Sequence, residues 1–281
     1  MENKTLESYN LTNTIDRSNK LLLSVQFELN GFSFCVVDID NSKVVLAEII
    51  NTNTLSYSDN IVELNNVLKA YEFNKNSFVE IIFSIFSRQL LVVPDEYYGK
   101  DMTDKLLNFS FSNIVNSKNL SEHSEHYSTY FLYTVDADFL NELATNFLPE
   151  PIFCNSTKKL IDNIYKDFTI CDLSKTIFVN FLSKDIEIIV LNYKTLVYYN
   201  NFQYSQAEDV LYYLALVAKN VNLSLADVEL VFYGNIRKED SSVNYLNKFV
   251  RSISFSNNCQ ETCLISLPLN LQHQFYNLLH S

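Results

Sequence analysis

Glycine is almost missing from this chain, whose 281 residues include three glycines: Gly31, Gly99 and Gly234. A protein of this length has about twenty at the usual frequency of roughly 7%. The phosphate loops of P-loop NTPases, dinucleotide-binding enzymes and protein kinases each need two or three glycines within about eight residues. No two glycines here lie closer than 68 residues (99 − 31). The sequence therefore excludes these three kinds of loop.

Positive charge is also scarce. The chain has 21 Lys and Arg against 33 Asp and Glu, a net charge of −12. An acidic protein repels nucleic-acid phosphates and anionic membrane surfaces, so we expect no nucleic-acid partner. No run approaches 18 uninterrupted apolar residues, so we expect no membrane insertion. The first residues lack the apolar core of a signal peptide, and five cysteines is an odd number. These features favour reduced thiols and a cytoplasmic location.

Apolar material is ample, with 47% hydrophobic and 14% aromatic residues, enough for one large domain or two smaller ones. Residues 1–20 are polar and aperiodic, which predicts a flexible tail. Leu23, Val25 and Phe27 then alternate with polar residues, which predicts a half-buried strand. The Asn30-Gly31 dipeptide predicts the hairpin turn that follows it. The predicted elements after this turn are strands at 32–39 and 44–50, a helix at 58–71 and a strand at 78–84.

The same order of elements recurs about 150 residues later in the chain. Ser183-Lys184 forms the predicted first turn, and Ser205 with Glu208 matches a capping box at the start of the helix. Gly234 ends the last strand of this second block. A βββαβ unit therefore occurs twice, which indicates a duplicated α/β fold. The second block comprises strands at 176–182, 185–191 and 195–199, a helix from 205 and a strand at 228–233.

The segments between and after the two blocks mix helices and strands. The polar stretch 116–127 is predicted to be a loop. Pro94 ends the first apolar run. The other predicted elements are strands at 90–93, 128–135, 251–255 and near 263–267, and helices at 103–111, from 138, from 156, at 240–250 and around Leu271, Phe275 and Leu278.

A duplicated βββαβ unit resembles the superfamily of actin, heat-shock chaperone ATPases and sugar kinases, in particular its bacterial cell-division and type IV pilus assembly branch. The run from Val92 to Tyr97 stands where an insert begins in that branch, and Thr134–Leu140 resembles the return to the core. The opening blocks Leu21–Gln26 and Gly31–Val36 are similar to an uncharacterised Bacteroidetes family of actin-like fold, a domain of unknown function.

The resemblance implies a two-lobed, actin-like and ribonuclease H-like fold. Lobe one would span residues 21–168, with an insert at about 95–135. Lobe two would span residues 169–281.

The resemblance also implies where a nucleotide would bind, because ATP with Mg²⁺ lies between the lobes in this superfamily. Each lobe's first hairpin offers backbone amides to the phosphates, beside an Asp. The matching first turn keeps Asn30, Gly31 and Ser33 but has no Asp, and the second turn, Ser183-Lys184, has no glycine. Gly234 stands alone where the adenosine turn has a glycine pair. Because a side chain blocks the amides of a phosphate turn, these six residues are candidates for a vestigial nucleotide cleft.

Three functional hypotheses follow. The first is a non-catalytic, cytosolic actin-like scaffold that binds a protein partner without a cofactor, through the cleft between the lobes or a groove on the insert. The second is a divergent ATPase or small-molecule kinase that uses ATP with Mg²⁺. It requires carboxylates such as Asp38, Asp172 or Asp185 to converge around the metal. The third is a self-assembling homo-oligomer.

Two further clusters have simpler explanations. His123 and His126 have acidic neighbours, and such a pair occurs in zinc sites, but no third ligand is identifiable. The polar sequence around them favours a solvated loop. Cys259 and Cys263 are four residues apart with no matching pair, which favours free thiols. The sequence predicts no catalytic residue and no metal site.

Overall fold

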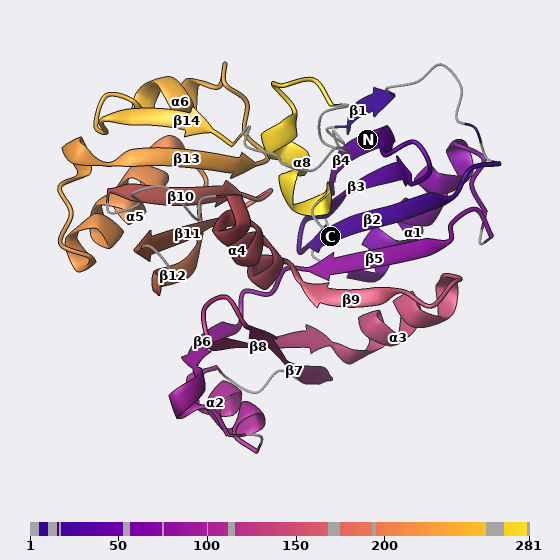
Figure 1. The fold of residues 1–281 in the computed structure, drawn as a ribbon, viewed down its shortest axis with the longest axis horizontal. Helices are drawn as coiled ribbons and strands as arrows, with labels where there is room; N and C mark the ends of the chain where they lie inside the picture. Colours follow the sequence, from indigo (N-terminus) through magenta and orange to yellow (C-terminus); the bar gives the residue numbers. More distant parts are fainter. Residues whose placement is uncertain are drawn as a thin grey trace. The chain divides into compact units, whose positions relative to one another are not determined.

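The computed structural model describes residues 6–10, 16, 18–52, 57–74, 76–99, 101–111, 116–167, 175–192, 195–256 and 267–279 (Figure 1). The chain divides into two compact units between Leu160 and Ile161. The division predicted from the sequence lies eight residues later, after residue 168. Helix α4 (Ser156–Asp167) is continuous across the division, so no break in the helical pattern marks it.

The N-terminal unit contains a six-stranded sheet in the order β1-β4-β3-β2-β5-β9. Its strands β2, β3 and β4 form an antiparallel meander, and β5 returns parallel to β2 after helix α1 (Tyr57–Ala70). The predicted βββαβ order is confirmed here. The strands are β1 (Leu6–Asn10), β2 (Leu21–Glu28), β3 (Gly31–Asp38), β4 (Lys43–Asn51), β5 (Glu80–Ile85) and β9 (Ile152–Asn155).

Strand β1 lies within the segment predicted to be a flexible tail. Leu6 is opposite Ile50 and Asn10 is opposite Leu46, so β1 extends the sheet antiparallel to β4. The sequence carries no periodic signal here, because the pairing depends on the backbone edge of β4 rather than on an alternation of side chains.

The central strand β2 is more deeply buried than its alternation predicts. Ser24 and Gln26, expected to face solvent, are buried together with Leu23 and Val25. Consecutive residues of β2 are buried, so both faces of the sheet are covered at this strand. Strands that are covered on both faces need not alternate apolar with exposed polar residues.

The insert of the N-terminal unit is a small sheet in the order β6-β8-β7. Strand β7 occupies most of the segment predicted to be a polar loop. Its side chains give no strand signal, because it is an edge strand that pairs with β8 through its backbone. The insert and the segment after it comprise β6 (Leu90–Pro94), a 3₁₀ turn η1 (Asp95–Tyr97), α2 (Thr103–Ser110), β7 (Ser117–Ser124), β8 (Thr129–Asp136) and α3 (Ala137–Asn146).

Glu122 connects the insert to the end of β9. One of its carboxylate oxygens, Oε1, accepts hydrogen bonds from the Tyr133 hydroxyl (2.5 Å) and from the Asn155 backbone N–H (2.7 Å). Burial, followed by the charge of Glu122, raises the pKa of Tyr133, so the phenol stays protonated and donates. The Asn155 side chain in turn accepts from the Lys158 N–H (3.0 Å) at the start of α4.

The C-terminal unit repeats the arrangement in a five-stranded sheet, β12-β11-β10-β13-β14. Strand β13 lies parallel to β10, as β5 does to β2. The strand predicted near residues 263–267 falls almost wholly outside the described residues. The elements are β10 (Thr176–Phe181), β11 (Asp185–Asn192), β12 (Thr195–Gln203), α5 (Ala207–Asn220), η2 (Leu225–Asp227), β13 (Glu229–Gly234), α6 (Ser241–Leu246), β14 (Ser252–Phe255) and α8 (Gln272–Leu279).

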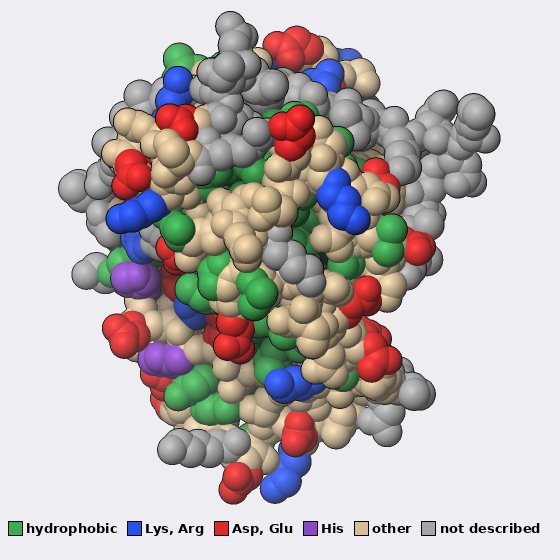
Figure 2. All heavy atoms as spheres, turned by 90° about the vertical axis from the view of Figure 1, so that its right-hand side faces the viewer, with side chains coloured by type: hydrophobic (Ala, Val, Ile, Leu, Met, Phe, Trp, Pro, Cys, Tyr) green, Lys and Arg blue, Asp and Glu red, His purple; other side chains and the backbone are tan. Residues whose placement is uncertain are grey.

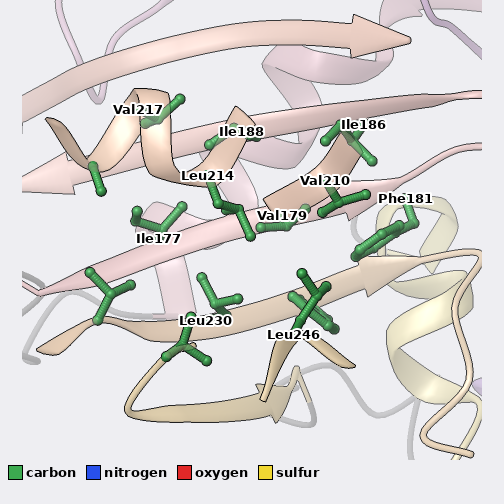
Figure 3. Packing of buried hydrophobic residues seen from close by; sticks show 14 of the residues in the cluster. Ile177, Val179, Phe181, Ile186, Ile188, Val210, Leu214, Val217, Leu230 and Leu246 are labelled. Carbon is green, nitrogen blue, oxygen red and sulfur yellow. The ribbon is translucent and has the colours of Figure 1, made fainter. Parts of the chain in front are cut away.

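Alternate residues of the C-terminal sheet build the core beneath α5 (Figure 3). On β10 these are Ile177, Val179 and Phe181, one face of the strand. Helix α5 presents Val210, Leu214 and Val217 to them, at the spacing of one helix face. The buried residues of α5 therefore lie on the face that packs on the sheet.

Both meanders contain a β-bulge at the same place. In the N-terminal unit Val36 is opposite Leu46 but Val37 is opposite Val44, so Val45 is the extra residue. In the C-terminal unit Val190 is opposite Tyr198 but Leu191 is opposite Leu196, which leaves Val197 extra. The bulges align residues 46–50 of β4 with residues 198–202 of β12.

Helix α5 begins two residues later than its predicted cap. The capping box uses Gln206 and Asp209, not Ser205 and Glu208. The Asp209 carboxylate accepts hydrogen bonds from the Ser205 N–H (2.9 Å), the Ser205 hydroxyl (2.8 Å) and the Gln206 N–H (3.2 Å). The bonds from Ser205, first its N–H and then its hydroxyl, lower the pKa of Asp209.

We expect the substitution Asp209→Ala to lower the thermal midpoint at neutral pH, because it removes three bonds at the helix start. A lowered folded-state pKa stabilises above the unfolded value of about 3.9, and this contribution is lost as the pH falls through the folded pKa. The deficit of the variant should therefore shrink in acid. Thermal unfolding followed by circular dichroism at several pH values measures it, with Glu208→Ala as the matched control. An equal deficit for both variants would contradict the assignment.

Candidate functional site

The first hairpin turn of the N-terminal unit consists of Leu29 and Asn30, since Glu28 is already opposite Gly31. The turn therefore lies one residue earlier than the predicted Asn30-Gly31. Neither turn residue has a positive φ, whereas Gly31 has φ +145° as the first residue of β3.

The Asn30 carbonyl of this turn and the Glu28 carbonyl just before it accept hydrogen bonds from the same unit. The Asn30 carbonyl accepts from the Thr52 N–H (2.8 Å), and the Glu28 carbonyl accepts from the Asn60 side-chain amide (3.2 Å). The Thr52 hydroxyl donates to the Asn60 side-chain carbonyl (3.0 Å), which completes the network. Asn30 and Ser33 are both buried.

Gly31 is explained by its neighbour in the sheet. A Cβ atom at this position would collide with the Ile50 carbonyl oxygen of β4. The close approach of that backbone, together with the positive φ, requires glycine whether or not a phosphate binds nearby.

The matching turn of the C-terminal unit is Ser183-Lys184, as predicted. Tyr204 closes over it: the Tyr204 N–H donates to the Lys184 carbonyl (3.1 Å) and its hydroxyl donates to the Leu182 carbonyl (3.2 Å). The Tyr204 ring also meets the edge of Phe181, with centroids 5.9 Å apart. Neither turn residue has a positive φ, so this turn needs no glycine.

Gly234 lies beside the strand that leads into this turn. It ends β13 opposite Phe181, with φ +78°, and a Cβ atom would collide with the Phe181 carbonyl oxygen. The following Asn235 N–H donates to that same oxygen (2.7 Å). The structure therefore brings together Gly234 and the base of the Ser183-Lys184 turn, and the packing of β13 against β10 accounts for the glycine.

Of the carboxylates proposed as metal ligands, Asp38 lies in the N-terminal unit and Asp185 in the C-terminal unit. Asp38 is opposite Leu21, at the far end of its hairpin from the turn, where it accepts from the side-chain amides of Asn19 (2.7 Å) and Asn41 (2.8 Å). Asp185 is buried and directly follows the Ser183-Lys184 turn. Asp172 lies outside the described residues.

Sequence reasoning missed a buried carboxylate on β11. Glu187 is 1% exposed and accepts hydrogen bonds from the Asn180 side-chain amide (2.8 Å) and the Tyr199 hydroxyl (3.0 Å). A glutamate inside the apolar run Ile186–Val190 was the available signal. Its two donors come from neighbouring strands, so the network satisfies the charge within one face of the sheet.

Of the two histidines of the polar segment, His126 lies in the turn after β7. His123 lies on β7, where its Nε2 contacts an Asp95 carboxylate oxygen at 3.0 Å and its ring lies against Tyr130. Throughout the part of the chain that the structure describes, no three His, Cys, Asp or Glu residues cluster as metal ligands would. Cys259 and Cys263 lie outside that part.

An apolar pocket of about 450 Å³ opens on the N-terminal unit between α1, the start of β5 and the end of α3. Figure 2 faces the side on which α1 and α3 lie and shows hydrophobic side chains at that surface. The pocket is away from the insert, where one groove was predicted. Its size suits a small ligand or a few side chains of a partner. Its apolar lining is Val62, Leu68, Phe73, Phe78, Ile81, Phe147 and Leu148, and its polar rim is Asn65, Asn66, Lys69, Asn74 and Asn146.

Comparison with known protein families assigns the chain to one of them. A family model described as "Protein of unknown function (DUF3822)" matches residues 10–253. The chain belongs to this family. No curated protein matches the chain.

Two solved structures share the fold. One is a Bacteroides thetaiotaomicron protein with an actin-like ATPase fold and unknown function, which is 21% identical with a TM-score of 0.76. The match covers 96% of this chain and all of that one. The other is the PilM-PilN type IV pilus biogenesis complex, at 7% identity and a TM-score of 0.58, covering 92% of this chain and 97% of the matched chain. The DUF3822 chain therefore has the actin-like fold. None of its described helices is long and apolar enough to cross a membrane.

We expect Gly31→Ala and Gly234→Ala each to cost about 1–3 kcal/mol of folding free energy, because both combine a positive φ with a backbone collision. Gly99→Ala is the matched control, since a Cβ there meets only the Met102 side chain, at 3.5 Å. Urea denaturation measures all three. Stability unchanged in the first two variants would show that these glycines are not required by sheet packing.

Proposed function

We propose that this DUF3822 protein is a non-catalytic, cytoplasmic actin-like scaffold that binds another protein and needs no nucleotide. The observation that carries the proposal is the state of the two hairpin turns. The first turn has no Asp, and the second has no glycine that would leave its backbone amides open to a phosphate. Both glycines near them serve strand packing. A fold kept after its phosphate contacts are gone is free to serve as a binding surface.

The apolar pocket supports the binding role. Val62 and Leu148 at its mouth are 56% and 54% exposed, so two large apolar side chains of one pocket are open to solvent. Lys69 is the one charged residue among the described residues that line it. A partner that inserts apolar side chains and places a carboxylate near Lys69 fits this surface. The PilM-PilN structure, a two-protein complex, shares the fold.

A direct test is calorimetric titration of the full chain with ATP and Mg²⁺. We expect no heat of binding, because the lobe-one turn lacks an Asp and the second turn lacks glycine. The buried Asp185 beside the second turn is the feature that favours the alternative, a divergent ATPase or kinase. Micromolar binding that Asp185→Asn weakens would overturn the scaffold proposal and favour that alternative.

The docking role of the pocket is tested by using the purified chain to capture a partner protein from native lysate. We expect Leu148→Asp to lose the captured protein, since it places a charge in an apolar contact. Leu269→Asp is the control, because Leu269 is also exposed (66%) and lies outside the pocket. Equal capture by both variants would place the contact elsewhere.

A further inference from the structure

Strand β12 differs from the other sheet edges of the described chain. Natural sheets protect their edges with short strands, prolines or charged side chains. Strands β9 and β14 have four residues, β1 and β6 have five, and β7 carries Lys118 and Glu122. Strand β12 has nine residues, Thr195–Gln203, with no charge and no proline. It is the last strand of its sheet (Figure 1).

In the N-terminal unit, another strand pairs with the equivalent edge of the sheet. Its equivalent strand is β4, and there β1 pairs antiparallel with residues 46–50, directly after the bulge at Val45. The bulge at Val197 puts residues 198–202 of β12 in the same position. The bulge therefore does not prevent strand addition. In the C-terminal unit the order of the sheet ends at β12, and no described strand takes the place of β1.

The segment from Tyr198 to Phe202 is suited to pair with itself. A two-fold axis at Asn200 would place Tyr198 opposite Phe202 of the second copy, an aromatic cross-strand pair, with no like charges opposed. This is notable in a chain of net charge −12, in which most surfaces repel a second copy.

Helix α5 continues the surface beside this edge. Phe202 stacks on Tyr213 with centroids 4.3 Å apart, and Tyr213 meets Tyr212. Tyr212 and Leu216, one turn apart on this side, are 64% and 38% exposed. The same two-fold axis places both α5 helices on one face of the joined sheet. The acidic start of one helix (Glu208) then approaches the basic end (Lys219) of the other.

We infer that a second copy of this chain binds through β12, so that two C-terminal units form one continuous ten-stranded sheet with α5 helices side by side. The interface is isologous and therefore closes at a dimer. It is independent of the proposed binding of a protein partner at the pocket between α1 and α3.

Sedimentation velocity over a range of concentrations tests the inference. We expect the wild-type chain to shift from monomer to twice that mass as concentration rises. Asn200→Lys and Asn200→Glu should each weaken the dimer about tenfold or more, because each places like charges across the axis. An equimolar mixture of the two variants should recover the dimer. Recovery requires residue 200 of one copy to face residue 200 of the other.

Two further variants separate the interface from general effects of charge and folding. Asn244→Lys adds the same charge at an exposed position of α6 and should leave the dimer intact. Tyr212→Ser lies outside the strand and should weaken the dimer, with circular dichroism confirming the fold. A wild-type chain that stays monomeric, a dimer insensitive to Asn200→Lys, or a mixture that fails to recover would each overturn the inference.

Discussion

One pairing determines the form of each unit. The first strand of the meander lies parallel to the strand that follows the helix, so β2 lies beside β5 and β10 beside β13. Parallel neighbours cannot be joined by a tight turn, so the chain must cross over through α1 or α5. The pairing brings the end of the parallel strand next to the first hairpin. Gly234 lies against Phe181 for this reason.

The same arrangement buries polar side chains in the central strands. Ser24 and Gln26 on β2, and Asn180 on β10, are buried because both faces of the sheet are covered at these strands. The Glu187 carboxylate is kept in such a place by donors from β10 and β12. An uncompensated charge there would oppose folding. The network therefore favours the observed register, since Asn180 is directly opposite Glu187.

The sequence allowed the duplicated units to be predicted because their signals are local. Alternation on β10 and helix spacing on α5 are properties of adjacent residues, and both match the core. Strands β1 and β7 could not be predicted, because their sequences carry no regular alternation of apolar and polar residues and they join their sheets through backbone pairing. The cap of α5 was misplaced because Ser205-Glu208 and Gln206-Asp209 both fit the spacing of a capping box, and only the backbone conformation at Gln206 distinguishes them.

The candidate site was the least predictable part, for a physical reason. A glycine beside a hairpin is compatible with a phosphate contact or with the close approach of another backbone, and the sequence does not distinguish them. In the structure, the backbone that approaches Gly31 is the carbonyl oxygen of Ile50, 19 residues away in the chain (50 − 31). The backbone that approaches Gly234 is the carbonyl oxygen of Phe181, 53 residues away (234 − 181). Both positions exclude a Cβ atom, whereas Gly99 does not. In a chain with three glycines, two therefore stand where the sheet leaves no room for a side chain, and the demands of the fold are sufficient to retain them.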